Sequence, residues 1–534
     1  MIKSFADRVL DLAAAEPERT AVVCDGIVYT RREVARHIVR FAACLHELGV
    51  QPGARVGVVA RNSELHLVCA LAASHVGAVL VPLHFRSAPL EARHNLEDAG
   101  CSVVVFDQES APAYIEATRA EGSHPGSSPS AFVAIVDDMD VLSTPPDGVV
   151  ALSALCREAT AIPPRADLVE DDIAMIHYTS GSTGRAKGVC LTYRNIAASW
   201  ENWTREFPIG SDDVVLTVTP FAHVGGLQTF TLQVLIAGGV VIIQSHFSAD
   251  LALCQIERYR VTLMFGVPRI YAMICRAPEF WERDLSALRC AVVGGAAAPQ
   301  ELVQQCLDRG ISLSPSWGMT ETTGGATLLA ADHVAYHPQS VGSPLIHVQV
   351  RLEDDKGRPV APGRQGRLLI RGDSVAAGYW VNGAISPLDS RACGWFDTGD
   401  IAVQDARGYL SISGRSSDRI ISGGENIYPA EIECAMEGFP GAAEVAVVGV
   451  PDRMWGESPL LFVIPSDPNA PPTLEAVRTY LELRISRYKL PRFLRIVSHL
   501  PRTGQTGKID RRALAAIARG NAATASSSTA PHND

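Results

Sequence analysis

Short apolar runs alternate with longer amphipathic segments along the first part of the chain. Continuous apolar residues at 55–60, 78–83 and 103–106 predict buried strands, and the intervening segments 64–75 and 90–98 predict helices. Strands that are apolar throughout and separated by helices are typical of parallel sheets that helices cover on both faces. The pattern therefore predicts an α/β fold.

The same alternation returns after residue 189. Four further apolar runs predict strands, at 214–219, 240–243, 261–265 and 290–293. A helix is expected after Gly226, and an amphipathic helix at 251–259. The most apolar stretch, 226–243, contains Gln228 and Gln233, which favours a buried helix–strand unit over a membrane span. We expect a large N-terminal domain with two related parallel-sheet α/β halves.

The pattern of predicted strands and helices changes twice in the last third of the chain. Between 348 and 413, short strands punctuated by glycine-containing turns predict a small β-rich subdomain. Beyond Arg415 a compact α/β pattern follows, with a helix from Pro429, a strand at 444–450, a helix at 474–487 and a strand at 493–497. This piece has about one hundred residues, the size of a small domain.

These boundaries predict a domain at 1–414, a small α/β domain at 415–518 and a disordered tail at 519–534. Two segments rich in Ser, Pro and Gly, 123–130 and 145–164, are expected to be surface excursions. We expect neither these two segments nor the tail to take part in catalysis.

Composition fits a folded multidomain protein. The 534 residues exceed what one hydrophobic core usually organises. The net charge of −11 provides no general attraction for nucleic acid or for an anionic membrane. The twelve cysteines form no C-x-x-C pair, and the first residues have no signal-peptide pattern. Reduced thiols and a cytoplasmic location are the simple interpretation.

The most informative stretch is 179–188, Thr-Ser-Gly-Ser-Thr-Gly-Arg-Ala-Lys-Gly. It places three glycines, four hydroxyls and Lys187 directly after an apolar run. Glycines let backbone N–H groups approach phosphate oxygens, and a lysine adds charge. A Walker A loop would end in Gly-Lys-Ser/Thr, so that interpretation fails. A flexible polar loop is the alternative to a phosphate-binding loop.

Further segments fit the same chemistry in order: 317–321 (Trp-Gly-Met-Thr-Glu), 394–400 (Gly-Trp-Phe-Asp-Thr-Gly-Asp), 414–415 (Gly-Arg), 423–433 (Gly-Gly-Glu-Asn-Ile-Tyr-Pro-Ala-Glu-Ile-Glu) and 501–511 (Pro-Arg-Thr-Gly-Gln-Thr-Gly-Lys-Ile-Asp-Arg). Together with the loop at 178–189, these segments resemble the signature motifs of the adenylate-forming superfamily. That superfamily holds acyl-CoA synthetases, peptide-synthetase adenylation domains and beetle luciferases. The resemblance spans about 5–514 and is strongest to the acyl- or aryl-CoA ligase branch.

The resemblance implies a large N-terminal domain and a small mobile C-terminal one. It also implies that the chain uses ATP, Mg²⁺ and coenzyme A. Lys508 would contact the substrate carboxylate and the phosphate during adenylation, and Glu321 would bind Mg²⁺ with help from Thr183. Asp400 would accept hydrogen bonds from the ribose hydroxyls. The remaining nucleotide-binding residues would be Thr179, Ser180, Gly181, Ser182, Thr183, Gly184, Lys187, Gly295, Trp317, Gly318, Thr320 and Arg415.

Two departures from the family pattern concern motion. Ser417 stands where the family commonly has Asp or Lys as the hinge residue, and Ala186 stands where it usually has Pro. Both changes leave the activity plausible and bear only on domain rotation and loop dynamics.

Gly423 and Gly424 would let a pantetheine arm pass close to the backbone, which favours coenzyme A as the acceptor. A separate carrier protein uses the same pantetheine arm and stays open as an alternative. His223, in 220–227, would lie beside the acyl carboxylate as a catalytic gate residue. The expected pocket segments 265–268, 294–298 and 322–325 are small and mostly uncharged, which indicates a neutral aryl or aliphatic acid.

Three hypotheses of different class follow. The chain is a CoA ligase, an adenylation enzyme that loads a separate carrier protein, or a catalytically silent nucleotide-binding protein. The presence of Lys187, Glu321, Asp400, Arg415 and Lys508 disfavours the silent protein. A luciferase-like oxidase is neither required nor excluded by the sequence.

Overall fold

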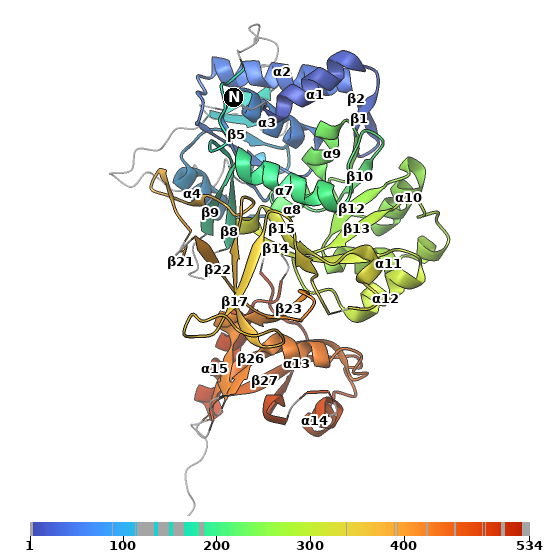
Figure 1. Ribbon diagram of the computed structural model, residues 1–534, viewed down its shortest axis with the longest axis vertical. Coiled ribbons are helices and arrows are strands. Elements are labelled where there is room, and N and C mark those ends of the chain that lie inside the picture. Colours follow the sequence, from blue (N-terminus) through green and yellow to red (C-terminus); the bar gives the residue numbers. More distant parts are fainter. Residues whose placement is uncertain are drawn as a thin grey trace, which may run out of the picture. The chain divides into compact units, whose positions relative to one another are not determined.

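The structure is a computed structural model that describes residues 4–87, 89–112, 114, 133–136, 149–152, 165–180, 186–337, 339–388, 390–391, 394–422, 425–452, 455–482, 484–485, 487–503 and 508–525. The chain divides into two compact units, which we describe separately (Figure 1). The first unit comprises 1–350 and 370–396, and the second comprises 351–369 and 397–534.

The first nine-stranded sheet of the first unit has the order β20-β19-β9-β8-β4-β3-β5-β6-β7. Its parallel part joins β8, β4, β3, β5, β6 and β7, and the strands β8, β9, β19 and β20 run antiparallel to one another. The strands are β3 (Arg55–Val59), β4 (Val79–Leu83), β5 (Cys101–Phe106), β6 (Val133–Val136), β7 (Val149–Ala151), β8 (Ile173–Ser180), β9 (Ala186–Thr192), β19 (Gly378–Val381) and β20 (Ala384–Ser386).

The second nine-stranded sheet has the order β16-β15-β14-β13-β12-β10-β11-β1-β2. It is parallel from β14 to β1 and antiparallel at both ends. The strands are β1 (Thr20–Cys24), β2 (Ile27–Thr30), β10 (Val214–Thr217), β11 (Val240–Ile243), β12 (Leu263–Gly266), β13 (Cys290–Val293), β14 (Leu313–Met319), β15 (Gly324–Leu328) and β16 (Ser343–Pro344). The two sheets confirm the predicted pair of parallel-sheet α/β halves.

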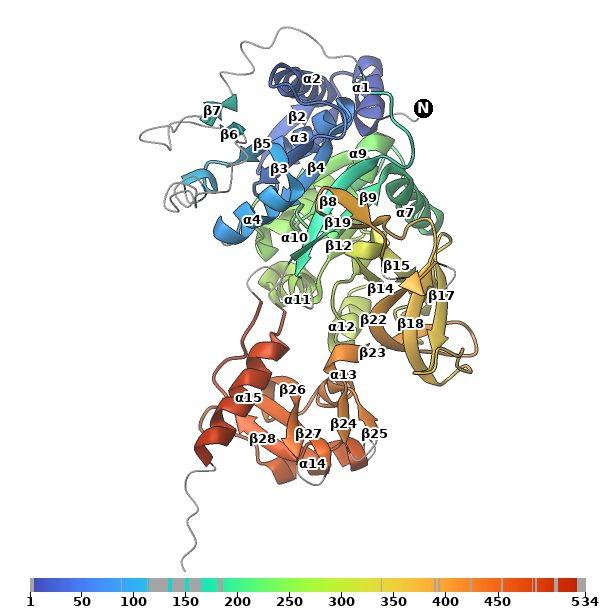
Figure 2. The ribbon, with the colours of Figure 1, turned by 90° about the vertical axis from the view of Figure 1, so that its left-hand side faces the viewer.

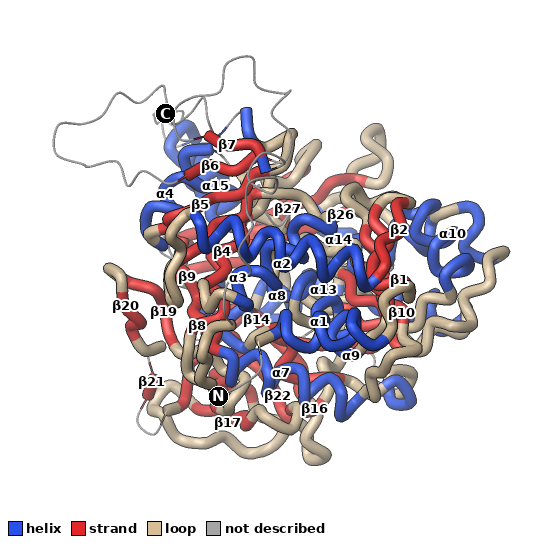
Figure 3. Tube along the Cα trace, turned by 90° about the horizontal axis from the view of Figure 1, so that it is seen from above, coloured by secondary structure: helices blue, strands red, loops and turns tan. Residues whose placement is uncertain are grey.

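Helices fill the space beside these sheets. They are α1 (Phe5–Ala15), α2 (Arg31–Glu47), α3 (Glu64–His75), α4 (Pro89–Ala99), α7 (Tyr193–Glu206), α8 (Val224–Leu227), α9 (Thr231–Ala237), α10 (Ala249–Tyr259), α11 (Pro268–Arg276) and α12 (Gln300–Asp308). Helix α1 contacts α2, α3 and α9 (Figure 3). Ser4 and Thr30 begin α1 and α2 with capping boxes, in which side chain and backbone satisfy each other's hydrogen bonds. Within the described residues, no helix is long and apolar enough to cross a membrane.

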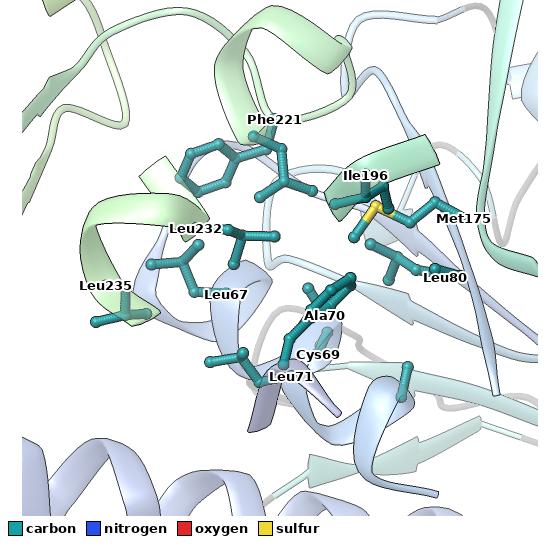
Figure 4. Close-up of a cluster of buried hydrophobic side chains, with 14 of the residues drawn as sticks. Leu67, Cys69, Ala70, Leu71, Leu80, Met175, Ile196, Phe221, Leu232 and Leu235 are labelled. Atoms are coloured by element: carbon teal, nitrogen blue, oxygen red, sulfur yellow. The ribbon is translucent and has the colours of Figure 1, made fainter. Parts of the chain in front are cut away.

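Helix α3 is buried along almost its whole length, which accounts for its nearly continuous apolar sequence. Leu67 and Leu71 of α3 belong to one large core together with Leu80 of β4 and Leu232 and Leu235 of α9 (Figure 4). The same core includes strand residues of both nine-stranded sheets. The two halves of the first unit therefore share one hydrophobic core.

A third, five-stranded sheet has the order β17-β18-β22-β21, with β23 also paired to β22. Its strands are β17 (Gln349–Glu353), β18 (Gln365–Arg371), β21 (Ser390–Arg391), β22 (Trp395–Gln404) and β23 (Leu410–Arg415). This sheet agrees with the β-rich subdomain expected between 348 and 413.

The rest of the second unit is a small α/β layer. Its sheet has the order β25-β24-β27-β26, with β28 parallel to β27. The elements are β24 (Ile420–Ser422), β25 (Glu425–Ile427), α13 (Pro429–Ala435), β26 (Ala442–Asp452), β27 (Gly456–Pro465), α14 (Leu474–Glu482), β28 (Phe493–Ile496) and α15 (Arg511–Ala525). Leu461 of β27 shares a core with α13 and α14, whereas Phe462 shares one with α15. Figure 2 shows these helices and strands as ribbons. Alternate residues of a strand point to opposite faces, so the helices cover both faces of the sheet.

Three predictions need correction. Helix α14 ends at Glu482, earlier than the predicted 487. Residues 149–151, expected in a surface excursion, form β7 at the edge of the first sheet. Helix α15 continues to Ala525, where a disordered tail was expected from 519. The segment 123–130 lies outside the described residues, and the boundary at 414/415 stays a prediction.

Candidate active site

The predicted phosphate loop joins two paired strands of the first unit. Thr179 near the end of β8 pairs with Lys187 near the start of β9. Gly181, Ser182, Thr183 and Gly184 lie outside the described residues, and so does residue 185. A Cβ atom at Gly188 would lie 2.8 Å from Ile176, which explains why this position is glycine. The strand pairing thus fixes Lys187 at the base of the loop.

Lys187 lies beside Tyr379 of β19, and Tyr379 in turn contacts Glu321. The Lys187 Nζ atom is 4.9 Å from the centroid of the Tyr379 ring. The hydroxyl of Tyr379 donates a hydrogen bond of 2.8 Å to Oε1 of Glu321, whose residue is only 7% exposed. The fold therefore gathers the predicted phosphate lysine and the predicted metal carboxylate at one place, with an aromatic ring in contact with both.

A tight hairpin between β14 and β15 presents Glu321. The Met319 amide donates to the Thr322 hydroxyl, and this hydroxyl donates to the Gly324 carbonyl at 2.6 Å. A Cβ atom on Gly318 would lie 1.8 Å from the Gly324 oxygen, so only glycine permits this approach. The carbonyl of Glu321 also accepts a hydrogen bond from the Ala376 amide at 2.8 Å. The hairpin thereby holds the Glu321 backbone from both sides.

The other predicted residues of this motif share the hairpin. Trp317 pairs with Thr327 across the two strands and packs against the main core of the first unit. Thr320 lies in the single 3₁₀ turn that also contains Glu321. Trp317, Gly318, Thr320 and Glu321 are therefore positioned together, and their roles in binding adenine and a metal ion stay predictions.

His223 lies directly before α8. Side chains from other parts of the first unit form hydrogen bonds to the backbone of the residues that precede it. The Asn62 side chain donates to the Thr219 carbonyl and accepts from the Phe221 amide, at 2.9 and 2.8 Å. Nδ1 of His177 lies 3.0 Å from the carbonyl oxygen of Ala222. These contacts join β3, β8 and the His223 segment.

A second histidine accompanies His223. The ring of His84, which follows β4, has its centroid 5.6 Å from that of His223. Burial, together with the charges of His223 and Arg86, lowers the pKa of His84 to about 4. Nδ1 of His84 is 3.0 Å from the Arg86 amide nitrogen, which places the proton on the other ring nitrogen. His84 is therefore neutral at pH 7.

Glycines frame the aromatic side chain of Phe265 near this segment. A Cβ atom would lie 2.5 Å from the Phe265 ring at Gly225 and 3.1 Å from it at Gly294. Gly295 follows with a φ of +78°, a backbone conformation that favours glycine. The predicted pocket segments 265–268 and 294–298 thus meet the His223 segment at one aromatic ring, whereas in the third, 322–325, Gly325 faces Trp203 instead.

Asp400 and Arg415 form an ion pair in the second unit. The Arg415 Nε atom lies 2.8 Å from Oδ1 of Asp400, and the two residues pair directly between β22 and β23. A further nitrogen of Arg415 donates to the Thr398 carbonyl at 3.0 Å. Asp400 is 4% exposed. The guanidinium group neutralises this buried carboxylate and fixes its direction.

Lys508 belongs to the same unit as this ion pair. Its pKa is lowered, first by dehydration of the ammonium group and then by the positive charge of Arg415, while Asp400 acts in the opposite direction. The residue as a whole is solvent-exposed, so the dehydration is local to the ammonium group. The second unit therefore brings Asp400, Arg415 and Lys508 into one electrostatic environment.

Gly423 and Gly424 lie outside the described residues. The flanking strands β24 and β25 form a hairpin in which Ser422 pairs with Glu425. Ser417 lies in a 3₁₀ turn, 416–418, directly after β23.

Tyr379 is the site residue that sequence reasoning missed. It occurs in the segment Gly-Tyr-Trp at 378–380, without a charged neighbour that would mark it as functional. Its contact Glu321 lies 58 positions earlier in the chain. The only local signal was an aromatic pair at the start of a short strand.

The residues around Glu321 fit a magnesium ion that ATP brings with it. The described residues contain no cluster of three or more side chains able to hold a metal ion. Mg²⁺ is commonly bound by one or two carboxylates together with substrate phosphates and water. Glu321, with Lys187 nearby for the phosphates, provides this partial donor set.

Comparison with known proteins agrees with these observations. The profile of the AMP-binding enzyme family matches residues 10–380, and that of the AMP-binding enzyme C-terminal domain matches residues 431–508. A feruloyl-CoA synthase of Amycolatopsis sp is 38% identical over 499 residues, covering 93% of this chain and 95% of that protein. An indoleacetate–CoA ligase of Aromatoleum aromaticum is 35% identical over 509 residues. The similarity covers 94% of this chain and 96% of that protein.

A solved structure is also similar over most of the chain. It is an o-succinylbenzoate coenzyme A synthetase from Bacillus subtilis in complex with ATP and magnesium ion, with a TM-score of 0.79 and 26% sequence identity. The similarity covers 95% of this chain and 98% of that one.

Proposed function

Because this chain belongs to the AMP-binding enzyme family and matches the profiles of both of its domains, we propose that it is an ATP-dependent carboxylic acid–CoA ligase. The acid would be a neutral aryl or aliphatic one. The arrangement that supports this proposal most directly is the joint placement of Lys187 and Glu321 around Tyr379.

In the first half-reaction, the carboxylate of the acid attacks the α-phosphate of ATP and pyrophosphate leaves. Both the nucleophile and the leaving group are anionic, so catalysis depends on positioned cations and on orientation. Lys187 would hold phosphate oxygens, and Glu321 would bind the Mg²⁺ that neutralises phosphate charge. Lys508 would contact the acid and the α-phosphate, and Asp400 would orient the ribose.

In the second half-reaction, a thiol attacks the acyl carbon of the adenylate, and AMP leaves. Gly423 and Gly424 would leave room for the pantetheine arm of coenzyme A beside the backbone. The relatives reported above are named as CoA ligases or synthetases, which favours coenzyme A as the acceptor. A carrier protein with the same arm is the alternative acceptor.

We propose a neutral acid because the segments around His223 carry few charged side chains. Phe265, Gly294 and Gly295 provide an aromatic and small lining without charge. The feruloyl-CoA and indoleacetate names of two relatives point to aromatic acids as the first to test. An amino acid is disfavoured, because no acidic side chain for its ammonium group stands next to His223 in the sequence.

We also propose the cytoplasm as the location. The ten cysteines of the described residues are all free thiols. Free, mostly buried thiols are usual in a reducing compartment.

The deciding experiment measures pyrophosphate release from ATP and Mg²⁺ across a panel of acids, with and without coenzyme A. Ferulate, indoleacetate, a saturated fatty acid and an amino acid form the smallest useful panel, and mass spectrometry identifies the products. Acyl-CoA from a neutral acid confirms the proposal. Adenylate without thioester would instead support a carrier-protein acceptor, and no release with any acid would contradict ligase activity on this panel.

A further inference from the structure

Tyr379 contacts the predicted metal carboxylate and the predicted phosphate lysine at once. We propose that Tyr379 is a positioning residue that orients Glu321 for Mg²⁺ and keeps the Lys187 ammonium group available for phosphate. This inference rests on the proposed function, because it assigns a role within the same ATP site. Its two parts follow from two different contacts of one side chain.

The first contact fixes the carboxylate. The Tyr379 hydroxyl donates a hydrogen bond of 2.8 Å to Oε1 of Glu321. Hydrogen bonds to ionised groups are stronger than those between neutral groups. The bond occupies one oxygen of the Glu321 carboxylate. Under the proposal, Oε2 would be the oxygen that binds the metal ion.

The second contact holds the ammonium group. The Lys187 Nζ atom lies 4.9 Å from the ring centroid, within the range of a cation–π interaction. This contact attracts the lysine without neutralising it. Lys187 and Glu321 form no ion pair in the described part of the chain, although both touch Tyr379. A direct ion pair would use the charges that the phosphates and Mg²⁺ need.

The backbone keeps Tyr379 at this position. Tyr379 pairs with Val189 and Trp380 with Gly188, so β19 is hydrogen-bonded to the strand that carries Lys187. The indole N–H of Trp380 donates to the Asp98 carbonyl at 3.0 Å. The neighbouring Tyr178 donates to the Asp98 side chain at 2.6 Å. Tyr379 and Lys187 therefore sit on one rigid pair of strands.

The test uses two substitutions that remove different parts of the Tyr379 side chain. Tyr379→Phe removes the hydroxyl and keeps the ring, whereas Tyr379→Leu removes both contacts. We expect Tyr379→Phe to raise the Mg²⁺ concentration needed for half-maximal ATP binding about tenfold, the loss typical of a hydrogen bond to a charged group. Tyr379→Leu should in addition weaken ATP binding measured without Mg²⁺. Both are followed by calorimetry on the full chain.

Tyr336→Phe is the matched control, because Tyr336 belongs to the same unit and is 78% exposed. It should leave both quantities unchanged. A double-mutant cycle with Glu321→Gln separates positioning from a general structural role. If Tyr379 acts through Glu321, Tyr379→Phe should shift the Mg²⁺ dependence less than twofold in the Glu321→Gln background.

Equal effects of Tyr379→Phe in both backgrounds, or an unchanged Mg²⁺ dependence, would overturn the inference. These binding measurements do not require turnover. If the wild-type chain binds Mg²⁺ and ATP with the expected variant effects but activates no acid, the proposed function fails and the positioning role stands. If acyl-CoA forms normally and the variants bind Mg²⁺ and ATP like the wild type, only the positioning role fails.

Discussion

Lys508 combines a solvent-exposed position with an ammonium group whose pKa the surrounding protein and Arg415 lower. A less strongly hydrated lysine gives up little solvation when it approaches a phosphate oxygen. The negative charge of Asp400 opposes this lowering of the Lys508 pKa. At the scale of one residue, Lys508 is thus suited to contact anions that bind and leave in every turnover.

Lys508→Ala should reduce acyl-adenylate formation by roughly 10²–10³, the usual cost of removing one preorganised charge-stabilising donor. Thioester formation from supplied acyl-adenylate should be largely kept. Single-turnover measurements of the two half-reactions check this. Lys489→Ala serves as a control, since Lys489 forms an ion pair with Glu431 within the second unit and has no role in the proposed reaction. Equal losses of both half-reactions would contradict the assignment.

Single residues show most clearly which parts of the site can be predicted from the sequence alone. Lys187, Glu321, Asp400, Arg415 and Lys508 could be singled out, because each stands in a recognisable local motif. Tyr379 could not, because its significance comes from contacts with Glu321 and Lys187, which lie far away in the sequence. The pairing of Asp400 with Arg415 was likewise hidden, because only the register of β22 and β23 brings them together.

At the scale of elements, the β14–β15 hairpin shows how backbone geometry determines a functional position. Gly318 faces the Gly324 carbonyl so closely that a side chain cannot be accommodated. The register between the strands shifts between Trp317 and Gly318, and Glu321 follows within three residues. The position of the predicted metal ligand therefore depends on a glycine that binds nothing itself.

Gly318→Ala should destabilise the first unit by about 2 kcal/mol or more, because a Cβ atom would overlap backbone that cannot rotate away. It should also weaken Mg²⁺-dependent ATP binding, since Glu321 would move with the hairpin. Urea unfolding and calorimetry measure the two effects. Gly210→Ala is the control, as a Cβ atom there meets nothing within 4 Å, and we expect a change within about 0.5 kcal/mol.

Elements were predicted well where hydrophobicity alone decides them. The strands β3, β4, β5, β11 and β13 lie within one or two residues of the apolar runs that predicted them. Prediction failed where other forces decide. The strand β7 depends on its pairing with β6, and α14 and α15 end at positions other than the predicted ones.

At the scale of the whole molecule, buried histidines make stability depend on pH. Burial lowers the pKa of His66 and of His177 to about 4, against about 6.5 in an unfolded chain. Between these values the unfolded state binds protons that the folded state does not. The free energy of unfolding should therefore rise with pH from 4 to 6.5 and be independent of these groups above 7.

Each such histidine should contribute a slope of at most about 1.4 kcal/mol per pH unit. His177→Asn isolates one of them, because the asparagine amide can still donate to the Ala222 carbonyl while it does not titrate. Urea midpoints between pH 5 and 7.5 should show a smaller slope for this variant than for the wild type. Identical slopes would mean that the pKa of His177 is the same in the folded and the unfolded chain.

The pairing of β19 with β9 also has a consequence for biosynthesis. Val189 and its partner Tyr379 are 190 positions apart. While the ribosome elongates the chain at 5–20 residues per second, the outer edge of β9 waits roughly 10–40 s for its neighbour. An unpaired strand edge is prone to associate with other chains. A released fragment that ends at residue 370 should therefore aggregate more readily than one that ends at residue 400, which contains both strands.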